Sequence, residues 1–252
     1  MLSRLFLRYL GIDYSGAATA RTGLTGIRVY QTTPGHSPIE IRPPSGHWSR
    51  DALAAWLAYT LADGAPTLVG IDHGLSFPSN YFQHHGLEKN WRSFLADFHT
   101  HWPTDQANTT VRELRPNNLR TGEPRWRRQP EKRCAAKSVF HFDVPGSVAT
   151  STHAGLPWIH QLTRQLPAVH YWPFDGWAPT KGKSVLTEAY PALCSKLYPQ
   201  ECRTPDQHDA YSLARWFEEL DQKCQLANLF QPALAPEERE IANHEGWILG
   251  VE

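Results

Sequence analysis

The sequence is poor in the residues that build disulfide scaffolds and zinc sites. It has four cysteines, none of them in a C-x-x-C pair, and its 13 histidines form no H-E-x-x-H motif. A chain of 252 residues can bury a core without covalent cross-links. We therefore expect reduced thiols and no cysteine-bound zinc. The cysteines are Cys134, Cys194, Cys202 and Cys224.

Long apolar runs are also missing. None reaches the roughly 18 residues that a membrane-spanning helix needs. The apolar start of the chain is interrupted by Arg8, and no small-residue cleavage site follows it, which argues against a signal peptide. We therefore predict a globular protein of the cytoplasm that does not bind membranes.

Net charge is also absent, since 25 basic residues balance 25 acidic ones, but the charges are unevenly placed. Residues 112–137 hold nine basic side chains against three acidic ones, with Trp126 among them. Cations beside an aromatic ring suit binding of a phosphate backbone. A solvated face or a disordered loop is the structural alternative. The residues predicted to contact nucleic acid are Arg125, Arg127, Arg128 and Lys137.

The first 72 residues predict a three-stranded meander, a helix and a fourth strand. The helix is capped by Ser49 and ends at Gly64, and its apolar residues recur at helical spacing. The fourth strand is a continuous apolar run, which is typical of a strand buried on both faces. The predicted strands are Leu5–Asp13, Thr25–Thr32, Pro38–Arg42 and Thr67–Asp72.

The rest of the chain predicts an insertion followed by further α/β elements. Residues 79–136 have weak periodicity, which favours a helix near Trp91–His101 and then a long basic loop. A capping box, Thr204-Pro-Asp-Gln207, marks the start of the last helix. We expect one α/β domain over residues 1–252, with 79–136 as an insertion. The other predicted elements are strands at 137–142, 169–174 and 185–190 and a helix at 155–166.

Five acidic residues stand at strand ends or at one helix start. Asp13 and Asp72 end the first and fourth strands, which are neighbours in the proposed topology, and Glu188 closes a later strand. Asp206 and Asp209 lie three residues apart, and hence on one helix face. Together they predict a catalytic carboxylate cluster.

Grouped carboxylates repel one another unless a cation neutralises them. Mg²⁺ and Mn²⁺ prefer oxygen ligands, and a pair of such ions can drive phosphodiester hydrolysis. We predict Asp13, Asp72, Asp206 and Asp209 as metal ligands, with Glu188 less securely placed. Four of the five acids also have a structural interpretation: an Asx-turn for Asp13, the helix dipole for Asp206 and Asp209, and an arginine partner for Glu188.

Eight motifs, taken in order along most of the chain, resemble the domain of unknown function 429 family. They are Gly11-Ile-Asp-Tyr-Ser-Gly16, Gly70-Ile-Asp-His-Gly-Leu-Ser-Phe-Pro78, Lys137-Ser-Val-Phe140, Gly146-Ser-Val-Ala-Thr-Ser-Thr152, Trp172-Pro-Phe-Asp175, Thr187-Glu-Ala-Tyr-Pro-Ala192, Asp206-Gln-His-Asp-Ala-Tyr211 and Glu245-Gly-Trp-Ile-Leu-Gly250. The resemblance implies a ribonuclease H-like fold and a nuclease related to Holliday-junction resolvases.

The resolvase pattern has an Asp on the first strand, an acid on the fourth and Asp-x-x-Asp on the last helix. Asp13, Asp72, Asp206 and Asp209 match it. Resolvases generally carry Glu at the second position, where this chain has the shorter Asp72 followed by His73. Glu188 has no clear counterpart in resolvases and belongs to the pattern of the resembled family.

Two other functions stay open at this point. An actin-like or sugar-kinase-like phosphotransferase or ATPase shares the strand-end Asp and the Gly-rich turn, but it normally needs two such domains. A non-catalytic nucleic-acid-binding module would use the acids only for structure. The expected partner is DNA or RNA, and assembly into a homodimer is left open.

Overall fold

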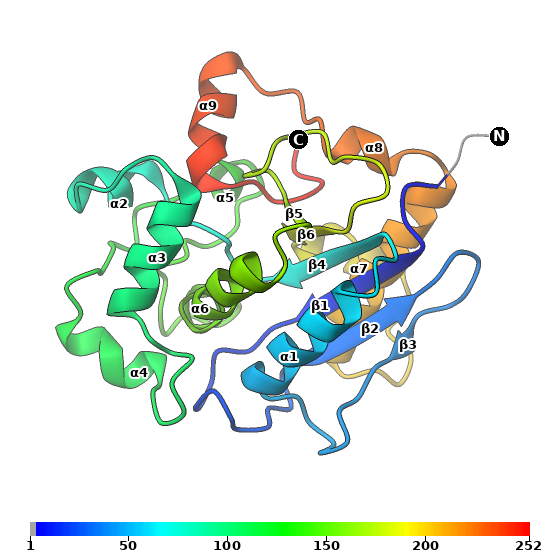
Figure 1. The fold of residues 1–252 in the computed structure, drawn as a ribbon, viewed down its shortest axis with the longest axis horizontal. Helices are drawn as coiled ribbons and strands as arrows, with labels where there is room; N and C mark the ends of the chain where they lie inside the picture. The colour runs from blue at the N-terminus through cyan, green and yellow to red at the C-terminus, as the bar shows by residue number, and fades with distance from the viewer. Residues whose placement is uncertain (1–3) are drawn as a thin grey trace.

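Six strands form one mixed sheet within residues 4–252, the part of the chain that this computed structural model describes (Figure 1). The order is β3-β2-β1-β4-β6-β5, and helices cover both faces, which confirms the predicted α/β class. The strands are β1 Arg8–Asp13, β2 Arg28–Thr32, β3 Ile39–Glu40, β4 Thr67–Asp72, β5 His170–Tyr171 and β6 Val185–Glu188.

The strand directions place two acidic strand ends side by side. β1 and β2 are antiparallel, as are β2 and β3, so the predicted meander is confirmed. β1 and β4 are parallel neighbours, and their register aligns Asp13 with Asp72. β6 joins the other edge of β4 in parallel and places Glu188 beside Ile71.

Helix α7 (Pro205–Gln222) covers one face of the sheet. Its apolar stripe, which includes Leu213 and Phe217, is buried against residues of β1 and β4. Gly11 of β1 allows this close approach, because a Cβ there would lie 2.1 Å from the Ala210 carbonyl oxygen. The predicted capping box fixes the start of the helix, since Thr204 Oγ1 accepts from the Gln207 N–H at 3.3 Å.

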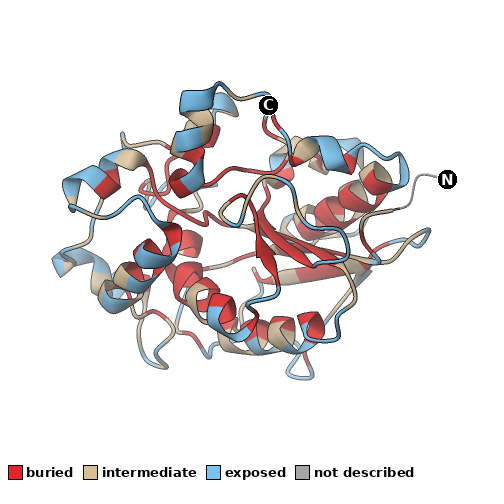
Figure 2. Ribbon diagram, turned by 45° about the horizontal axis from the view of Figure 1, so that its top comes forward, coloured by how far each residue is buried: buried red, intermediate tan, exposed pale blue. Residues whose placement is uncertain are grey.

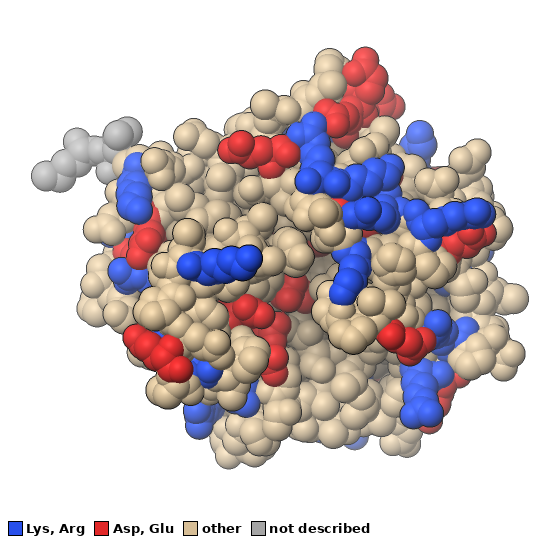
Figure 3. Space-filling model, turned by 180° about the vertical axis from the view of Figure 1, so that it is seen from behind, with Lys and Arg blue, Asp and Glu red and all other residues tan. Residues whose placement is uncertain are grey.

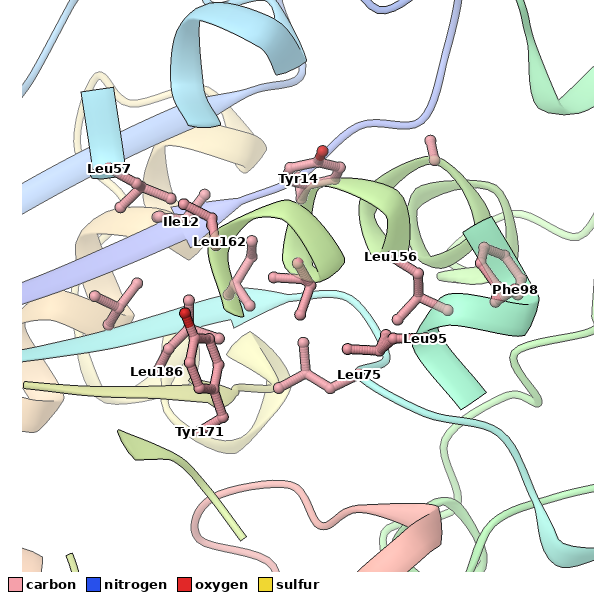
Figure 4. Packing of buried hydrophobic residues seen from close by; sticks show 14 of the residues in the cluster. Ile12, Tyr14, Leu57, Leu75, Leu95, Phe98, Leu156, Leu162, Tyr171 and Leu186 are labelled. Carbon is pink, nitrogen blue, oxygen red and sulfur yellow. The ribbon is translucent and has the colours of Figure 1, made fainter. Parts of the chain in front are cut away.

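The other face is covered by α1 (Arg50–Leu61) and α6 (Ala149–Gln165). Ser49 caps α1 as predicted, accepting from the Ala52 N–H at 3.1 Å. Figure 4 shows Leu162 of α6 beside Ile12 of β1, whereas Leu156, earlier in the same helix, lies beside Leu95 and Phe98 of α3. In Figure 2 the strands are buried and the helices are buried mainly on their inner sides. Most of the core therefore lies between the sheet and these layers.

Residues 79–136 form short helices at one end of the sheet (Figure 1). The helix predicted over Trp91–His101 is confirmed, whereas the predicted long basic loop contains three short helical segments. Aromatic side chains of the segment, including Tyr81 and Phe94, belong to the same buried cluster as Ile12 and Val69 of the sheet. Organisation as one domain with an insertion stays a prediction. The helices of the segment are α2 Ser79–His84, α3 Trp91–His101, α4 Val111–Leu114, η1 Arg115–Asn117 and α5 Gln129–Arg133.

Two predicted elements differ from the structure. Residues 137–142 are not a strand, because Val139 and Phe140 are buried outside the sheet. The ring centroid of Phe140 lies 4.7 Å from that of Phe77, after β4, and 5.7 Å from that of Tyr81 in the insertion. Helix α6 begins at Ala149 rather than at the predicted Gly155. The sequence did not reveal these first turns, because their residues are mainly small and polar and show no apolar spacing. The sequence prediction omitted α2 and four C-terminal segments, namely η2 Pro191–Leu193, η3 Ser195–Leu197, α8 Leu226–Leu229 and α9 Pro236–Glu245. Among residues 4–252 no helix has the length and apolarity needed to cross a membrane.

Candidate functional site

Asp13 and Asp72 lie side by side at the carboxyl ends of β1 and β4. Burial raises the pKa of Asp13 from 3.8 to about 9, and the charge of Asp72 acts in the same direction. Burial likewise raises the pKa of Asp72 to about 8, with the charge of Asp209 adding to it. A hydrogen bond with Asp13 partly opposes this rise. The two strand ends therefore hold carboxyl groups that resist ionisation without a cation.

Helix α7 brings the second pair of acids to the same place. Asp206 and Asp209 lie in its first two turns and are half-buried. Burial raises the pKa of Asp209; the nearby His208 lowers it, and the charge of Asp206 raises it further. The charges of both residues also raise the pKa of Asp13. The start of α7 therefore lies near enough to the end of β1 for its two carboxylates to act on the charge of Asp13.

All four aspartates line one cleft of about 540 Å³. Its other walls carry hydroxyl groups from the β1 loop, the start of α6 and the segment after β6, at Ser15, Ser147, Ser151, Tyr190 and Ser195. In Figure 3 acidic side chains lie in a hollow near the middle of the face shown, and Lys and Arg side chains lie around it. The sequence prediction missed these hydroxyls, although four of them, Ser15, Ser147, Ser151 and Tyr190, lie in motifs that carry the family resemblance.

The donor chemistry of the cleft suits a hard divalent cation. It offers four carboxylates, and within residues 4–252 none of them forms an ion pair with a Lys or Arg. Repulsion among the acids supplies a reason for a cation to bind there. However, no three His, Cys, Asp or Glu side chains in this described part converge as a ready ligand set. Metal binding therefore stays a proposal that requires the side chains to close around the ion.

The raised pKa values predict how stability depends on pH in the absence of metal. The folded protein keeps protons on Asp13 and Asp72 up to about pH 9 and pH 8, whereas the unfolded chain releases them near pH 4. Stability should therefore fall as pH rises through this window. We expect Asp13→Asn to raise the free energy of unfolding at pH 8 in EDTA by at least about 1 kcal/mol, the equivalent of about one pKa unit.

Thermal unfolding at pH 5 and pH 8 measures this effect. From pH 5 to pH 8, the melting temperature of the wild type should decrease by more than the melting temperature of Asp13→Asn does. Manganese should restore the wild type at pH 8, because a ligand of the folded state stabilises it. Parallel pH profiles for the two proteins would contradict the assignment of a buried, proton-retaining Asp13.

Glu188 has an arginine partner, which was the structural interpretation of this residue. Its two carboxylate oxygens accept from Arg128 Nη2 and Nη1 at 2.6 and 2.7 Å. One oxygen also accepts from the Leu75 N–H at 3.1 Å. Arg128 Nε donates to Glu131 at 2.7 Å, and all three charged groups are buried. Glu188 is thus occupied by a bidentate ion pair beside Asp72, which removes it from the candidate ligands.

The same pair overturns the prediction that Arg128 contacts nucleic acid, because its side chain is fully buried. Burial lowers the pKa of Arg128, but the carboxylates of Glu188 and Glu131 raise it above its ordinary value. The guanidinium therefore stays charged and joins α5 to β6. Sequence distance hid this contact, since Arg128 and Glu188 are 60 residues apart.

The other predicted nucleic-acid contacts have different surroundings. Arg127 donates to the carbonyl oxygens of Glu131 and Ala136, so it holds the turn after α5. Arg125 is exposed and pairs with Glu123 at 2.6 Å. Lys137 is exposed, donates to the Pro145 carbonyl oxygen, and lines a small pocket beside Asp72 and Glu188. Of the four predicted residues, Lys137 is the exposed one that shares a pocket with Asp72, whereas Arg128 lines the same pocket from its buried pair with Glu188.

His73, which follows Asp72, is directed away from the cleft. It is buried against α6, so close to Gly155 that a Cβ on this glycine would lie 2.5 Å from the His73 Nε2. Nδ1 bonds to the Gly74 carbonyl oxygen at 2.9 Å. Burial lowers the pKa of His73 to about 4, so the ring is neutral at pH 7. His73 is therefore a core residue under α6.

Comparison with known proteins adds no relative from which a role could be transferred. No protein-family model, curated protein or solved structure matches the chain. The resemblance to the domain of unknown function 429 family consequently stays an expectation from the sequence motifs. The function has to be argued from the geometry of the acidic cleft.

Proposed function

We propose that the protein is a metal-dependent nuclease with a ribonuclease H-like fold. One observation carries the proposal: Asp13 and Asp72 are aligned on adjacent parallel strands, and α7 adds Asp206 and Asp209 to the same cleft. The topology agrees with this plan, because a three-stranded antiparallel meander is followed by a helix and a parallel strand beside β1. The sequence resemblance points to the same fold and activity.

The four aspartates are the proposed ligands of Mg²⁺ or Mn²⁺. When bound, the metal supplies charge stabilisation and an activated water for attack on a phosphodiester. The carboxylates position the ion at the strand ends, where β1, β4 and α7 are fixed by packing. Ser15 and Ser147 lie on the cleft walls, and their hydroxyls can donate to phosphate oxygens, whereas the Ser151 hydroxyl already donates to the Val148 carbonyl oxygen at 3.0 Å.

Glu188 has a supporting role in this proposal. Its carboxylate, whose charge raises the pKa of Asp72, is paired with Arg128, and its contact with the Leu75 N–H holds the loop after β4. Asp72 is therefore positioned by its neighbour rather than sharing a metal with it.

Calorimetric titration with manganese tests the metal site directly. We expect the wild type to bind manganese and Asp13→Asn to bind at least about tenfold more weakly, because losing even a residue that only supports a metal ligand costs about 10–100-fold in affinity. Asp51→Asn is the matched control, since Asp51 is an exposed residue of α1 whose carboxylate lies 3.8 Å from Arg21. Equal binding by the wild type and Asp13→Asn would exclude Asp13 as a ligand.

Cleavage assays test the reaction. Labelled single-stranded, duplex and branched DNA and RNA are incubated with magnesium or manganese, beside an ATP-hydrolysis assay. We expect metal-dependent cleavage of at least one nucleic acid. Metal-dependent ATP turnover without cleavage would favour the phosphotransferase alternative, although the described residues contain one sheet and that class normally has two domains. Salt-sensitive binding without either activity would favour a binding module.

A further inference from the structure

A larger groove of about 780 Å³ lies beside the acidic cleft. The loop after β1, at residues 16–18, forms part of one wall, and α4 with η1 forms another. The groove and the cleft share boundaries, because Ser15 and Ser151 line the cleft while their neighbours Gly16 and Thr150 line the groove. A polymer seated in the cleft therefore has an adjacent channel to occupy.

Two arginines of the basic segment line this groove. Arg112 is exposed, and no residue of the described chain forms a side-chain hydrogen bond or ion pair with it. Arg115 pairs with Asp143, and its guanidinium lies 4.3 Å from the centroid of the Phe142 ring. A free cation can contact a phosphate, and a flat guanidinium held over a ring offers a stacking surface for a base. The wall therefore offers both kinds of contact that an unpaired strand uses.

A buried cation lies behind the opposite wall. Arg50 of α1 is 1% exposed and forms no ion pair within residues 4–252. It donates to the carbonyl oxygens of Ala17 and Ala18 at 2.7 and 3.1 Å, and its Nε has no partner. A buried charge without a counter-ion is costly. An anion in front of the 16–18 loop would offset this cost, so the buried charge independently favours an anionic occupant.

We propose that this groove binds a single strand of nucleic acid next to the acidic cleft. Arg112 contacts a backbone phosphate, a base stacks at Arg115 and Phe142, and the loop held by Arg50 faces a further phosphate. A base paired in a duplex cannot reach such a stacking surface, which is why the occupant is a single strand. This groove proposal rests on the proposed nuclease function in one respect, namely that the neighbouring acidic cleft is the cleavage site.

The test is binding measured without catalysis. Fluorescence anisotropy follows labelled 15-nucleotide oligothymidylate and oligouridylate in EDTA, over a range of salt concentrations. We expect Arg112→Ala/Arg115→Ala to bind at least about tenfold more weakly than the wild type. Arg112→Ala should reduce the slope of log affinity against log salt by about 0.7, the value for one phosphate contact on a single strand. Arg115→Lys should keep the slope but lose affinity, because it retains the charge and removes the flat surface.

Arg164→Ala is the matched control. Arg164 is exposed in the last turn of α6, and the first turn of α6 borders the groove at Thr150. It should bind within about twofold of the wild type, because surface charges far from the ligand are screened. Circular dichroism confirms that each variant is folded. Wild-type affinity in the double variant, an equal loss in Arg164→Ala, or tighter binding of a 15-base-pair duplex would overturn the proposal. If the protein binds a single strand through these arginines but cleaves no nucleic acid, the nuclease proposal fails while the groove proposal stands.

Discussion

Asp72→Asn is expected to lower metal-dependent cleavage by about 100-fold or more. The substitution keeps the shape of the side chain but removes a charged ligand from the cleft. Metal-ion charge stabilisation contributes several kcal/mol to a phosphodiester transition state, and each 1.36 kcal/mol is tenfold in rate. Nucleic-acid binding measured in EDTA at pH 9, where Asp72 is ionised, should hold or tighten, because one negative charge beside the phosphates is lost. The variant should therefore separate turnover from binding.

Single-turnover cleavage and anisotropy, measured on the same preparation, provide the two readouts. Asp51→Asn again serves as the control, since it makes the same chemical change at a side chain of α1 that is 51% exposed. Its rate should match that of the wild type. Cleavage by Asp72→Asn at the wild-type rate would show that this carboxylate is not part of the reaction.

The acidic cleft could be predicted from the sequence because its positions follow from local patterns. Two apolar runs end in Asp13 and Asp72, and the expected topology makes those strands neighbours. Thr204 and Gln207 fix the start of α7 through their own side chains, so the faces of the following residues are known. Secondary-structure periodicity and capping are local interactions, which is why they can be recognised without coordinates.

The partners of the basic side chains could not be predicted in the same way. Arg125 and Arg128 lie three residues apart in a similar composition, yet one is exposed and the other fully buried. The difference comes from Glu188, which only the fold brings near. The strand predicted at residues 137–142 is wrong for a related reason, because Phe140 is buried against the rings of Phe77 and Tyr81 rather than in the sheet. Contacts distant in sequence decide both cases.

The buried ion pair between Arg128 and Glu188 leads to a prediction about stability. Arg128→Met leaves Glu131 and Glu188 buried without their cation. Removing one partner of a buried pair typically costs about 3–5 kcal/mol, because the remaining charge is neither solvated nor paired. We expect the free energy of unfolding, measured with urea, to fall by about this amount. Arg128→Met combined with Glu131→Gln and Glu188→Gln should recover most of the loss, since no uncompensated charge remains.

Arg125→Met is the matched control for this measurement. Its partner Glu123 is at 2.6 Å, but the Arg125 side chain is 80% exposed. An exposed pair contributes about 0–1 kcal/mol, so the control should change stability little. Equal losses in Arg125→Met and Arg128→Met, or no recovery in the triple variant, would show that burial of the charge is not the cause. The expected pattern instead identifies Arg128 as the residue that holds α5 and β6 together behind Asp72, and it explains why the most buried arginine of the basic segment is unavailable to a substrate.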